Sequence, residues 1–343
     1  MVKALGVKAR TGAAGALALA LLAACGAPND RDPFVDSRPP PGLAERFYPP
    51  EGWAWGLVGV KDGPLQRYGV AAPPVVARGN VLILPDYGET AETWFETARD
   101  LNESGYTVWV LEGVGQGGSQ RLASPRDLGD VTSFDADALT VRAMIDQVIR
   151  ASPDAPVIVL GQGVGALIAA RALEVGARPA GVILSAPPCQ STYFEGGDLR
   201  RFGLGRLRGP GSAAWKRDGQ DAFAGGLTHD PWRGAVTHAW QTANPDLRMG
   251  GPSLDWLAAF SDLQRQTAGD LPRLAAPTLI MTRGGADACV AVPGAERQAI
   301  AGADRALELE DDARRGPWLG AVTAFLGRLT KATADRRAAD HAP

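Results

Sequence analysis

Short apolar runs alternate with longer amphipathic segments over most of the chain. The run NVLILP at residues 80–85 is followed by AETWFETARDLNES at 91–104, and four similar apolar runs come later. Short apolar runs predict strands that are buried on both faces, and the longer segments between them predict helices. Strand and helix in alternation predict an α/β fold with a mostly parallel sheet and helices on both faces. The four later runs are VWVLEG (108–113), PVIVLG (156–161), GVILSA (181–186) and PTLIMT (277–282).

The end of the chain continues this pattern in a weaker form. We expect a last strand near Ala306 to Leu309 and a closing helix over about residues 317–331. The remaining residues, 332–343, are polar and show no hydrophobic period, which predicts a flexible tail.

The alternation stops between about residues 189 and 267, where Gly-rich stretches appear. This segment predicts a cap inserted between two strands of a domain that spans residues 51–331. Before the domain, residues 26–50 are rich in Pro and polar residues, which is typical of a linker without regular structure. The inserted segment also holds four of the nine tryptophans, Trp215, Trp232, Trp240 and Trp256.

The N-terminus has the features of a targeting segment. Three cations, Lys3, Lys8 and Arg10, precede an apolar stretch that is too short for a membrane span and ends in Leu-Ala-Ala-Cys at Cys25. This ending resembles the bacterial lipobox, which implies a lipid on Cys25 and a membrane anchor in the cell envelope. Gly26 follows, and in the sorting rule of enteric bacteria a residue other than Asp favours the outer membrane, facing the periplasm. The alternative is an ordinary signal peptide cut near Ala24.

Composition and charge narrow the classes of partner. The chain has 343 residues, 45% hydrophobic and 21% charged, which is the balance of a globular protein with a large core. Its net charge is -3, and the cations of the N-terminal segment leave the rest more acidic still. The sequence has no cluster of Lys and Arg, so we expect no nucleic-acid partner.

Two cysteines remain after Cys25. Cys189 and Cys289 each follow a strand, and the two strands are expected to be neighbours in the sheet. In an oxidising periplasm the thiols either form a disulfide or stay as two separate buried groups.

The sequence Gly161-Gln162-Gly163-Val164-Gly165 connects a predicted strand directly to a predicted helix. Strand, tight turn and helix form the context of the nucleophile elbow, and its central residue here is Gly163, which tolerates a positive φ. A dinucleotide-binding loop is the alternative, but that loop needs G-x-G-x-x-G after the first strand. We therefore expect no cofactor.

The wider pattern resembles the bacterial lysophospholipases and monoacylglycerol lipases of the α/β-hydrolase superfamily, including serine aminopeptidase-like hydrolases. The segments that carry the resemblance are PDYGE at 85–89, EGVGQG at 112–117, LSAPP at 184–188 and, in the cap, LTHDPWR and MGGPSLDWL. The resemblance covers about residues 75–330 and implies an α/β-hydrolase fold with an inserted cap.

The resemblance also places the catalytic triad on this sequence. The nucleophile position falls on Gly163, the acid position on Asp287 and the histidine position on Arg305, so only the acid is retained. The chain has no histidine between His238 and His341, so the missing base does not depend on the register of the alignment.

The oxyanion turn of the family corresponds to Asp86 and Tyr87, together with Val164 after the elbow. Asp86 stands where the family has Gly, and its carboxylate would repel a developing oxyanion. Because Gly163, Arg305 and Asp86 depart from the family pattern, the resemblance predicts a non-catalytic protein that binds a lipid-like ligand or an envelope protein. The alternative is an active lysophospholipid or monoacylglycerol ester hydrolase with an unrecognised nucleophile.

Three carboxylates, Asp86, Glu112 and Asp287, follow predicted strands and suggest a cluster facing Arg305. We favour a plain salt bridge between Asp287 and Arg305, with the other two carboxylates capping turns, over an acid/base or cation site. No His or Cys lies at metal-ligand spacing, so we expect no metal. Alternative bases are His229 and His238 in the cap, whereas Ser119 and Ser185 resemble structural turn residues of the family.

Overall fold

The structure is a computed structural model. It describes residues 31–152, 154–188, 194, 197–218, 226–270, 276–284 and 292–340. Among these residues, no helix combines the length and the apolar character that crossing a membrane requires. The positions of Cys25, Cys189, Cys289 and Asp287 lie outside the described residues.

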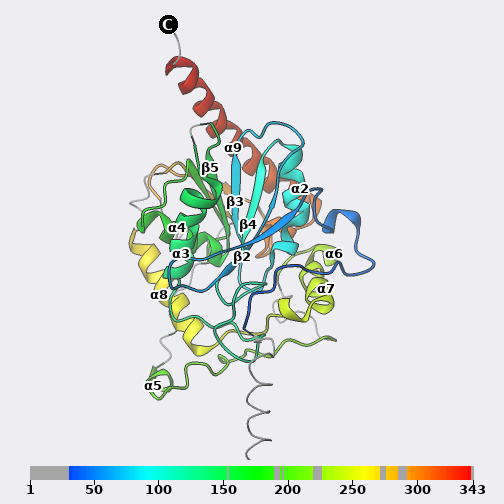
Figure 1. The fold of residues 1–343 in the computed structure, drawn as a ribbon, viewed down its shortest axis with the longest axis vertical. Helices are drawn as coiled ribbons and strands as arrows, with labels where there is room; N and C mark the ends of the chain where they lie inside the picture. The colour runs from blue at the N-terminus through cyan, green and yellow to red at the C-terminus, as the bar shows by residue number, and fades with distance from the viewer. Residues whose placement is uncertain are drawn as a thin grey trace, which may run out of the picture.

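An eight-stranded sheet forms the centre of the protein (Figure 1). Its order is β1-β2-β4-β3-β5-β6-β7-β8, and all neighbours from β4 to β8 are parallel, whereas β1 and β2 are antiparallel additions at one edge. The strands are β1 Ala54–Val58, β2 Gln66–Ala71, β3 Asn80–Leu84, β4 Thr107–Leu111, β5 Val157–Gln162, β6 Gly181–Ser185, β7 Thr278–Thr282 and β8 Glu296–Ala299.

Helices cover both faces of the sheet, as the alternating pattern predicts (Figure 1). Along β3, Leu82 packs with the cluster that includes α3, α4 and α8, and Ile83 packs with the cluster that includes α2 and α9. The helices and helical turns are η1 Glu45–Phe47, η2 Ala91–Trp94, α2 Phe95–Glu103, α3 Asp135–Ala143, η3 Met144–Ile149, α4 Val164–Glu174, α5 Gly197–Arg201, α6 Pro231–Gly234, α7 Val236–Ala243, η4 Pro245–Leu247, α8 Leu254–Asp270, η6 Leu307–Leu309 and α9 Asp312–Asp340.

The last strand differs from the expectation. Residues 306–309 do not form a strand: Leu307–Leu309 is the 3-10 turn η6, and the last strand is β8 at Glu296–Ala299. β8 is an exposed edge strand with the polar sequence ERQA, so it carries no apolar signal. Leu307 is instead apolar because it is buried in the core beside Trp318.

Three boundaries also differ from the sequence prediction. From Arg31 on, the segment expected to be a linker lies against the domain: Phe47 is buried, and Arg38 N donates to Asn244 Oδ1 at 2.7 Å. The α8 helix, expected within the cap, packs on α4 through residues such as Leu263. The α9 helix runs to Asp340, beyond the expected end of the domain.

Candidate functional site

The turn between β5 and α4 consists of one residue, Gly163. Its backbone has φ +53° and ψ −120°, and its N–H donates to Ser185 O at 2.9 Å. A positive φ is strained for residues with a side chain. Two residues later, a Cβ on Gly165 would lie 2.1 Å from Leu84 O, so helix and strand approach more closely than any other residue allows. The glycines of the G-x-G-x-G sequence therefore allow the tight strand–turn–helix connection of a nucleophile elbow.

The carboxyl group of Asp86 fills the space beside Gly163. A Cβ built on Gly163 would lie 2.1 Å from Asp86 Cγ and 2.3 and 2.4 Å from its two oxygens. Asp86 comes directly after β3 and Pro85, so the parallel neighbours β3 and β5 bring the two residues together. A side chain at position 163 can exist only if Asp86 moves away.

Two backbone amides converge on the same carboxyl group. Asp86 Oδ1 accepts hydrogen bonds from Tyr87 N at 2.7 Å and from Val164 N at 2.9 Å. Asp86, Tyr87 and Val164 are the three residues expected in the oxyanion turn, and the structure places them in one site. Paired amides of this kind stabilise an oxyanion in acyl-transfer enzymes. Here they bind an oxygen of the protein itself.

Two more buried acids lie behind Asp86. Glu89 Oε2 accepts from Asp86 N and from Trp94 Nε1, both at 3.0 Å. Burial, together with the charge of Asp86, raises the pKa of Glu89 to about 7. Burial and the charges of Glu89 and Asp86 raise the pKa of Glu308 well above its usual value.

Glu308 is not among the residues that the sequence predicts for the site, because a strand is expected at 306–309. The signal that would have found it is the alternation of ALELE, in which every second residue is charged although the segment reads as core. In the turn η6 Glu308 is buried together with both leucines.

Arg305 lies on the loop that faces the elbow. Its carbonyl oxygen accepts from Gln162 Nε2 at 2.9 Å, and its N–H donates to Gly226 O in the inserted segment at 3.2 Å. Burial raises the pKa of Asp86, and the positive charge of Arg305 acts in the opposite direction, as do the two amides. The charge of Arg305 therefore acts on Asp86 in this site.

Glu112 does not join this cluster; its carboxylate accepts from the turn amides of Ala91 and Gly118, as the favoured interpretation expects. It pairs with the buried Arg67 of β2 at 2.5 Å, and Arg67 also binds Glu92 at 2.9 Å. Ser119 Oγ accepts from Arg67 N at 2.9 Å, so Ser119 supports the same buried network. Ser185 Oγ likewise accepts from Trp318 Nε1 at 3.0 Å, which gives it a structural role, as expected.

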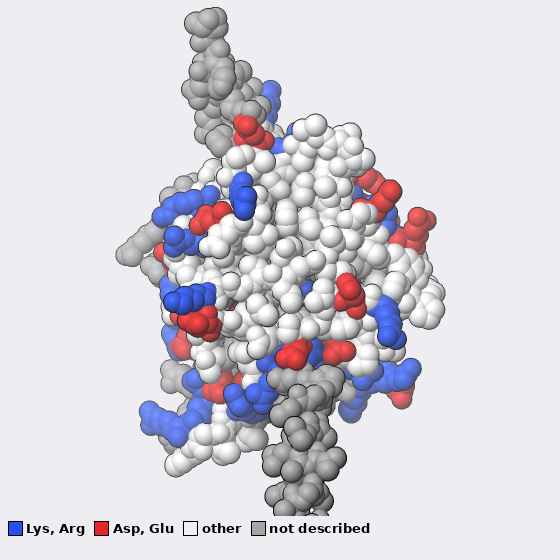
Figure 2. Space-filling model, viewed as in Figure 1, with Lys and Arg blue, Asp and Glu red and all other residues white. Residues whose placement is uncertain are grey.

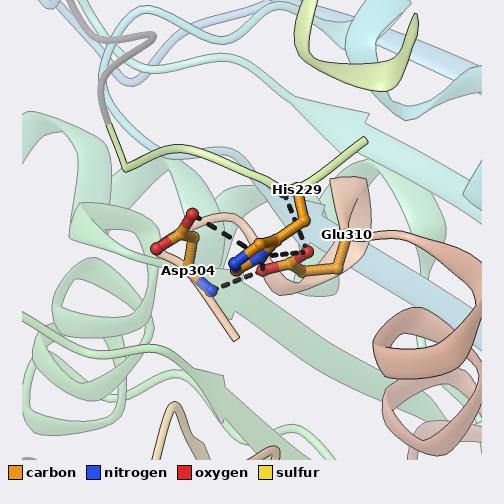
Figure 3. A group of neighbouring side chains, drawn as sticks. All are labelled: His229, Asp304 and Glu310. Atoms are coloured by element: carbon orange, nitrogen blue, oxygen red, sulfur yellow. Dashed lines mark hydrogen bonds and ion pairs between the residues drawn. The ribbon is translucent and has the colours of Figure 1, made fainter. Parts of the chain in front are cut away.

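A second group of titratable side chains joins the inserted segment to the loop after β8 (Figure 3). Among the described residues, His229, Asp304 and Glu310 offer ligand atoms within 4.8 Å of one another. His229 Nδ1 lies 3.0 Å from Glu310 Oε1, and Glu310 also accepts from the backbone N–H groups of His229, Asp304 and Asp311. These hydrogen bonds satisfy the buried Glu310 carboxylate without an ion, so we assign the group a structural role.

The other cap histidine and the cap tryptophans are also engaged in packing. The His238 ring stacks on Trp215 with centroids 5.3 Å apart, and its Nε2 pairs with Arg217 O at 3.0 Å. Trp256 packs edge-on against Tyr87 at 4.6 Å, and Trp240 is buried beside Phe95. Trp240 and Trp256 thus join the inserted segment and α8 to α2 and the loop after β3, while Trp232 is exposed.

The structure has the features of an α/β-hydrolase fold: the order of the strands, the elbow at Gly163 and the paired amides. The sequence profile of the serine aminopeptidase S33 family matches residues 76–311. The chain belongs to this family. A comparison with curated protein sequences finds no match.

Solved structures confirm the α/β-hydrolase fold of this S33-family protein. At identities this low the likeness shows the fold and not a shared activity. The similar structures include a lipase in its open form (TM-score 0.63, 15% identity, 81% of this chain and 99% of that chain), a monoglyceride lipase from Saccharomyces cerevisiae (0.61, 18%, 85% and 99%) and a monoacylglycerol lipase from Paleococcus ferrophilus (0.57, 17%, 77% and 99%).

Proposed function

We propose that this lipase-like α/β-hydrolase is a non-catalytic envelope lipoprotein that binds a lipid-like ligand or a partner protein. The observation that carries the proposal is the position of Asp86. Its carboxyl group takes the space of a side chain on Gly163 and occupies both amides that would stabilise an oxyanion. One residue therefore blocks two parts of the machinery for acyl transfer.

The chemistry of acyl transfer explains why these features prevent catalysis. A hydroxyl or thiol must attack the carbonyl carbon while a base accepts its proton. Glycine at position 163 offers no such group, and the guanidinium of an arginine at 305 is a hydrogen-bond donor without an acceptor nitrogen, so it cannot take the place of the histidine base. In triad enzymes, loss of the nucleophile or the base alone costs about 10⁶ in rate, and what remains depends on an oxyanion hole. In this protein Asp86 fills that hole.

A fluorophosphonate probe tests this part of the proposal, because it labels serine nucleophiles that an adjacent base has activated. We expect no labelling of the chain from Gly26 to Pro343 at any probe concentration that labels a serine lipase used as a control. Labelling of a residue near the elbow would contradict the proposal and would identify the nucleophile by mass spectrometry.

The lipid anchor rests on the resemblance of Leu22-Ala23-Ala24-Cys25 to the lipobox. Cys25→Ser should move the protein from the membrane fraction to the soluble fraction of the envelope, while Cys189→Ser should leave it on the membrane. Membrane attachment of Cys25→Ser equal to that of the natural protein would contradict the anchor.

A second candidate function keeps the chain as an ester hydrolase, with Asp86 as the unrecognised nucleophile. The observation in its favour is again the carboxyl group in the nucleophile's space. Its oxygen would form a bond to the ester carbonyl carbon, and the departing alkoxide would take a proton from water to leave as the alcohol. The hydroxide so formed would cleave the mixed anhydride, which releases the carboxylic acid product and restores the Asp86 carboxylate. We prefer the non-catalytic function, because the amides that should stabilise the oxyanion hold Asp86 itself.

A further inference from the structure

A short stretch of the inserted segment, around α5, presents large apolar side chains to solvent. Large apolar side chains that lie exposed next to one another mark interaction sites, whereas single exposed ones are normal. We call these four residues the apolar patch: Leu199, Phe202, Leu204 and Leu207, whose exposed fractions are 49%, 78%, 41% and 52%.

Arginines alternate with the residues of the apolar patch. Three of them form ion pairs with acids beside the patch: Arg200 with Asp255 at 2.8 Å, Arg206 with Asp130 at 3.4 Å and Arg208 with Asp127 at 2.7 Å. The Arg206 side chain nevertheless stays 63% exposed, and Arg201 is also exposed. Figure 2 shows blue and white side chains intermingled in this part of the surface, at the lower left of the view.

Apolar tips surrounded by guanidinium groups suit the boundary between lipid headgroups and acyl chains. The tips enter the apolar layer, and the guanidinium groups stay at the level of the phosphates.

The apolar patch lies at the end of the molecule where the described chain begins. Arg126 Nη1 donates to Asp32 O at 2.9 Å, and the next residue, Asp127, pairs with Arg208 of the patch segment. One loop thus contacts both the start of the described chain and the patch. Figure 1 places both at the lower end, opposite the end of α9.

Only residues 26–30 separate Cys25 from Arg31. A chain of this length reaches about 20 Å when fully extended. If Cys25 carries the lipid, as proposed above, this end of the domain stays close to the bilayer. Close tethering raises the effective concentration of the surface next to the anchor, so even weak insertion is then sufficient.

We propose that the apolar patch inserts into the lipid surface and fixes the orientation of the domain on the membrane. That the protein is at a membrane rests on the proposed lipoprotein function, but the contact between the apolar patch and lipid needs no lipid on Cys25. The domain then stands with α5 at the bilayer and the C-terminal part of α9 pointing away from it.

Vesicle flotation with the chain from Gly26 to Pro343 tests this contact without the anchor. Every described helix and strand lies between residues 31 and 340, so this form retains the whole described fold. The probes are vesicles of phosphatidylcholine alone and vesicles with one quarter phosphatidylglycerol. We expect the protein to float with the mixed vesicles, and Leu199→Ser, Phe202→Ser and Leu207→Ser together to lower the bound fraction about tenfold.

The matched control is Val75→Ser with Val76→Ser, which removes exposed apolar side chains (65% and 94% exposed) from the loop before β3. We expect it to bind as the natural sequence does, within about twofold. Equal flotation of the patch variant and the natural sequence would overturn the proposal. The proposal would also be overturned if the natural sequence did not bind vesicles but self-associated, and the patch variant lost this self-association. The patch would then be a protein interface. The Cys25→Ser fractionation decides the anchor separately.

Discussion

The Asp86 carboxyl group lies where a side chain on Gly163 would begin, with Cγ 2.1 Å from the ideal Cβ position. The two residues are 77 positions apart in the sequence and meet because β3 and β5 are parallel neighbours. Aspartate at 86 and glycine at 163 therefore depend on each other: the carboxyl group fits only beside a residue without a side chain.

Gly163→Ser should fold less stably and remain inactive. The new Cβ collides with Asp86, and the residue must keep a positive φ, so we expect a loss of about 1–3 kcal/mol in the free energy of unfolding. Urea denaturation measures the loss, and the fluorophosphonate probe measures the activity. Gly316→Ser is the matched control, because a Cβ there has nothing within 4 Å, and its stability should change by less than about 0.5 kcal/mol. An equally stable Gly163→Ser would contradict the packing described here.

Restoring hydrolysis should require three substitutions. From the sequence alone, Gly163→Ser with Arg305→His looks sufficient for weak esterase activity. The structure adds a requirement, because Asp86 still fills the oxyanion site of that double variant. We therefore expect ester hydrolysis only after Asp86→Gly is added, with a gain of about 10² to 10³ over the double variant. Turnover by the double variant equal to that of the triple variant would show that Asp86 does not block the site.

Asp137 should make the stability depend on pH. Burial raises its pKa to about 7, although the hydrogen bond that Oδ1 accepts from Val114 N at 2.8 Å acts in the opposite direction. Oδ2 has no hydrogen-bond partner among the described residues. An acid whose pKa is raised in the folded state stabilises it below its unfolded pKa, and this contribution is lost as pH rises toward 7.

Urea denaturation at pH 5 and pH 8 measures this effect. The natural protein should be less stable at pH 8, and Asp137→Asn should reduce the difference by about 1–3 kcal/mol. Asp135→Asn is the control, since its side chain is 54% exposed. An unchanged pH dependence in Asp137→Asn would mean that the carboxyl group is already ionised near pH 5.

Arg67 should be essential for stability although it has no catalytic role. Its guanidinium is fully buried between Glu92 and Glu112 and lies 4.1 Å from the centre of the Trp55 ring. Arg67→Ala leaves two buried carboxylates without their cation, which costs about 3–5 kcal/mol. Arg142→Ala removes a half-exposed pair with Asp146 and should cost less than about 1 kcal/mol. Similar unfolding midpoints for the two variants would disprove the importance of the buried network.

The sequence predicts the centre of the sheet better than its edges. Strands β3 to β7 are buried on both faces, so each reads as an apolar run with a clear beginning and end. β8 is exposed and polar, and its place beside β7 depends on backbone pairing that leaves no pattern in the side chains. The packing of α8 on α4 also leaves no distinct pattern in the sequence, because the apolar positions of a helix do not show which surface they cover.

The site shows a similar division. The resemblance to lipases implies an oxyanion turn of Asp86, Tyr87 and Val164 beside the nucleophile position Gly163, and the structure brings these residues together. The sequence suggested that Asp86 would repel an oxyanion nearby. The sequence could not show that the carboxyl group takes the oxyanion's place, because this depends on the direction of the Asp86 side chain at the ends of the parallel strands β3 and β5. Glu112 looked equivalent to Asp86 in sequence, but Arg67 binds it elsewhere.

The most direct test of the account is ester hydrolysis by the natural sequence from Gly26 to Pro343. The substrates are p-nitrophenyl butyrate, a monoacylglycerol and a lysophospholipid, and Asp86→Asn is assayed beside the natural sequence. We predict that both proteins give only the background rate, because Asp86 occupies the oxyanion amides and position 163 has no nucleophile. Turnover by the natural sequence that disappears in Asp86→Asn would contradict the account and would make Asp86 a catalytic residue.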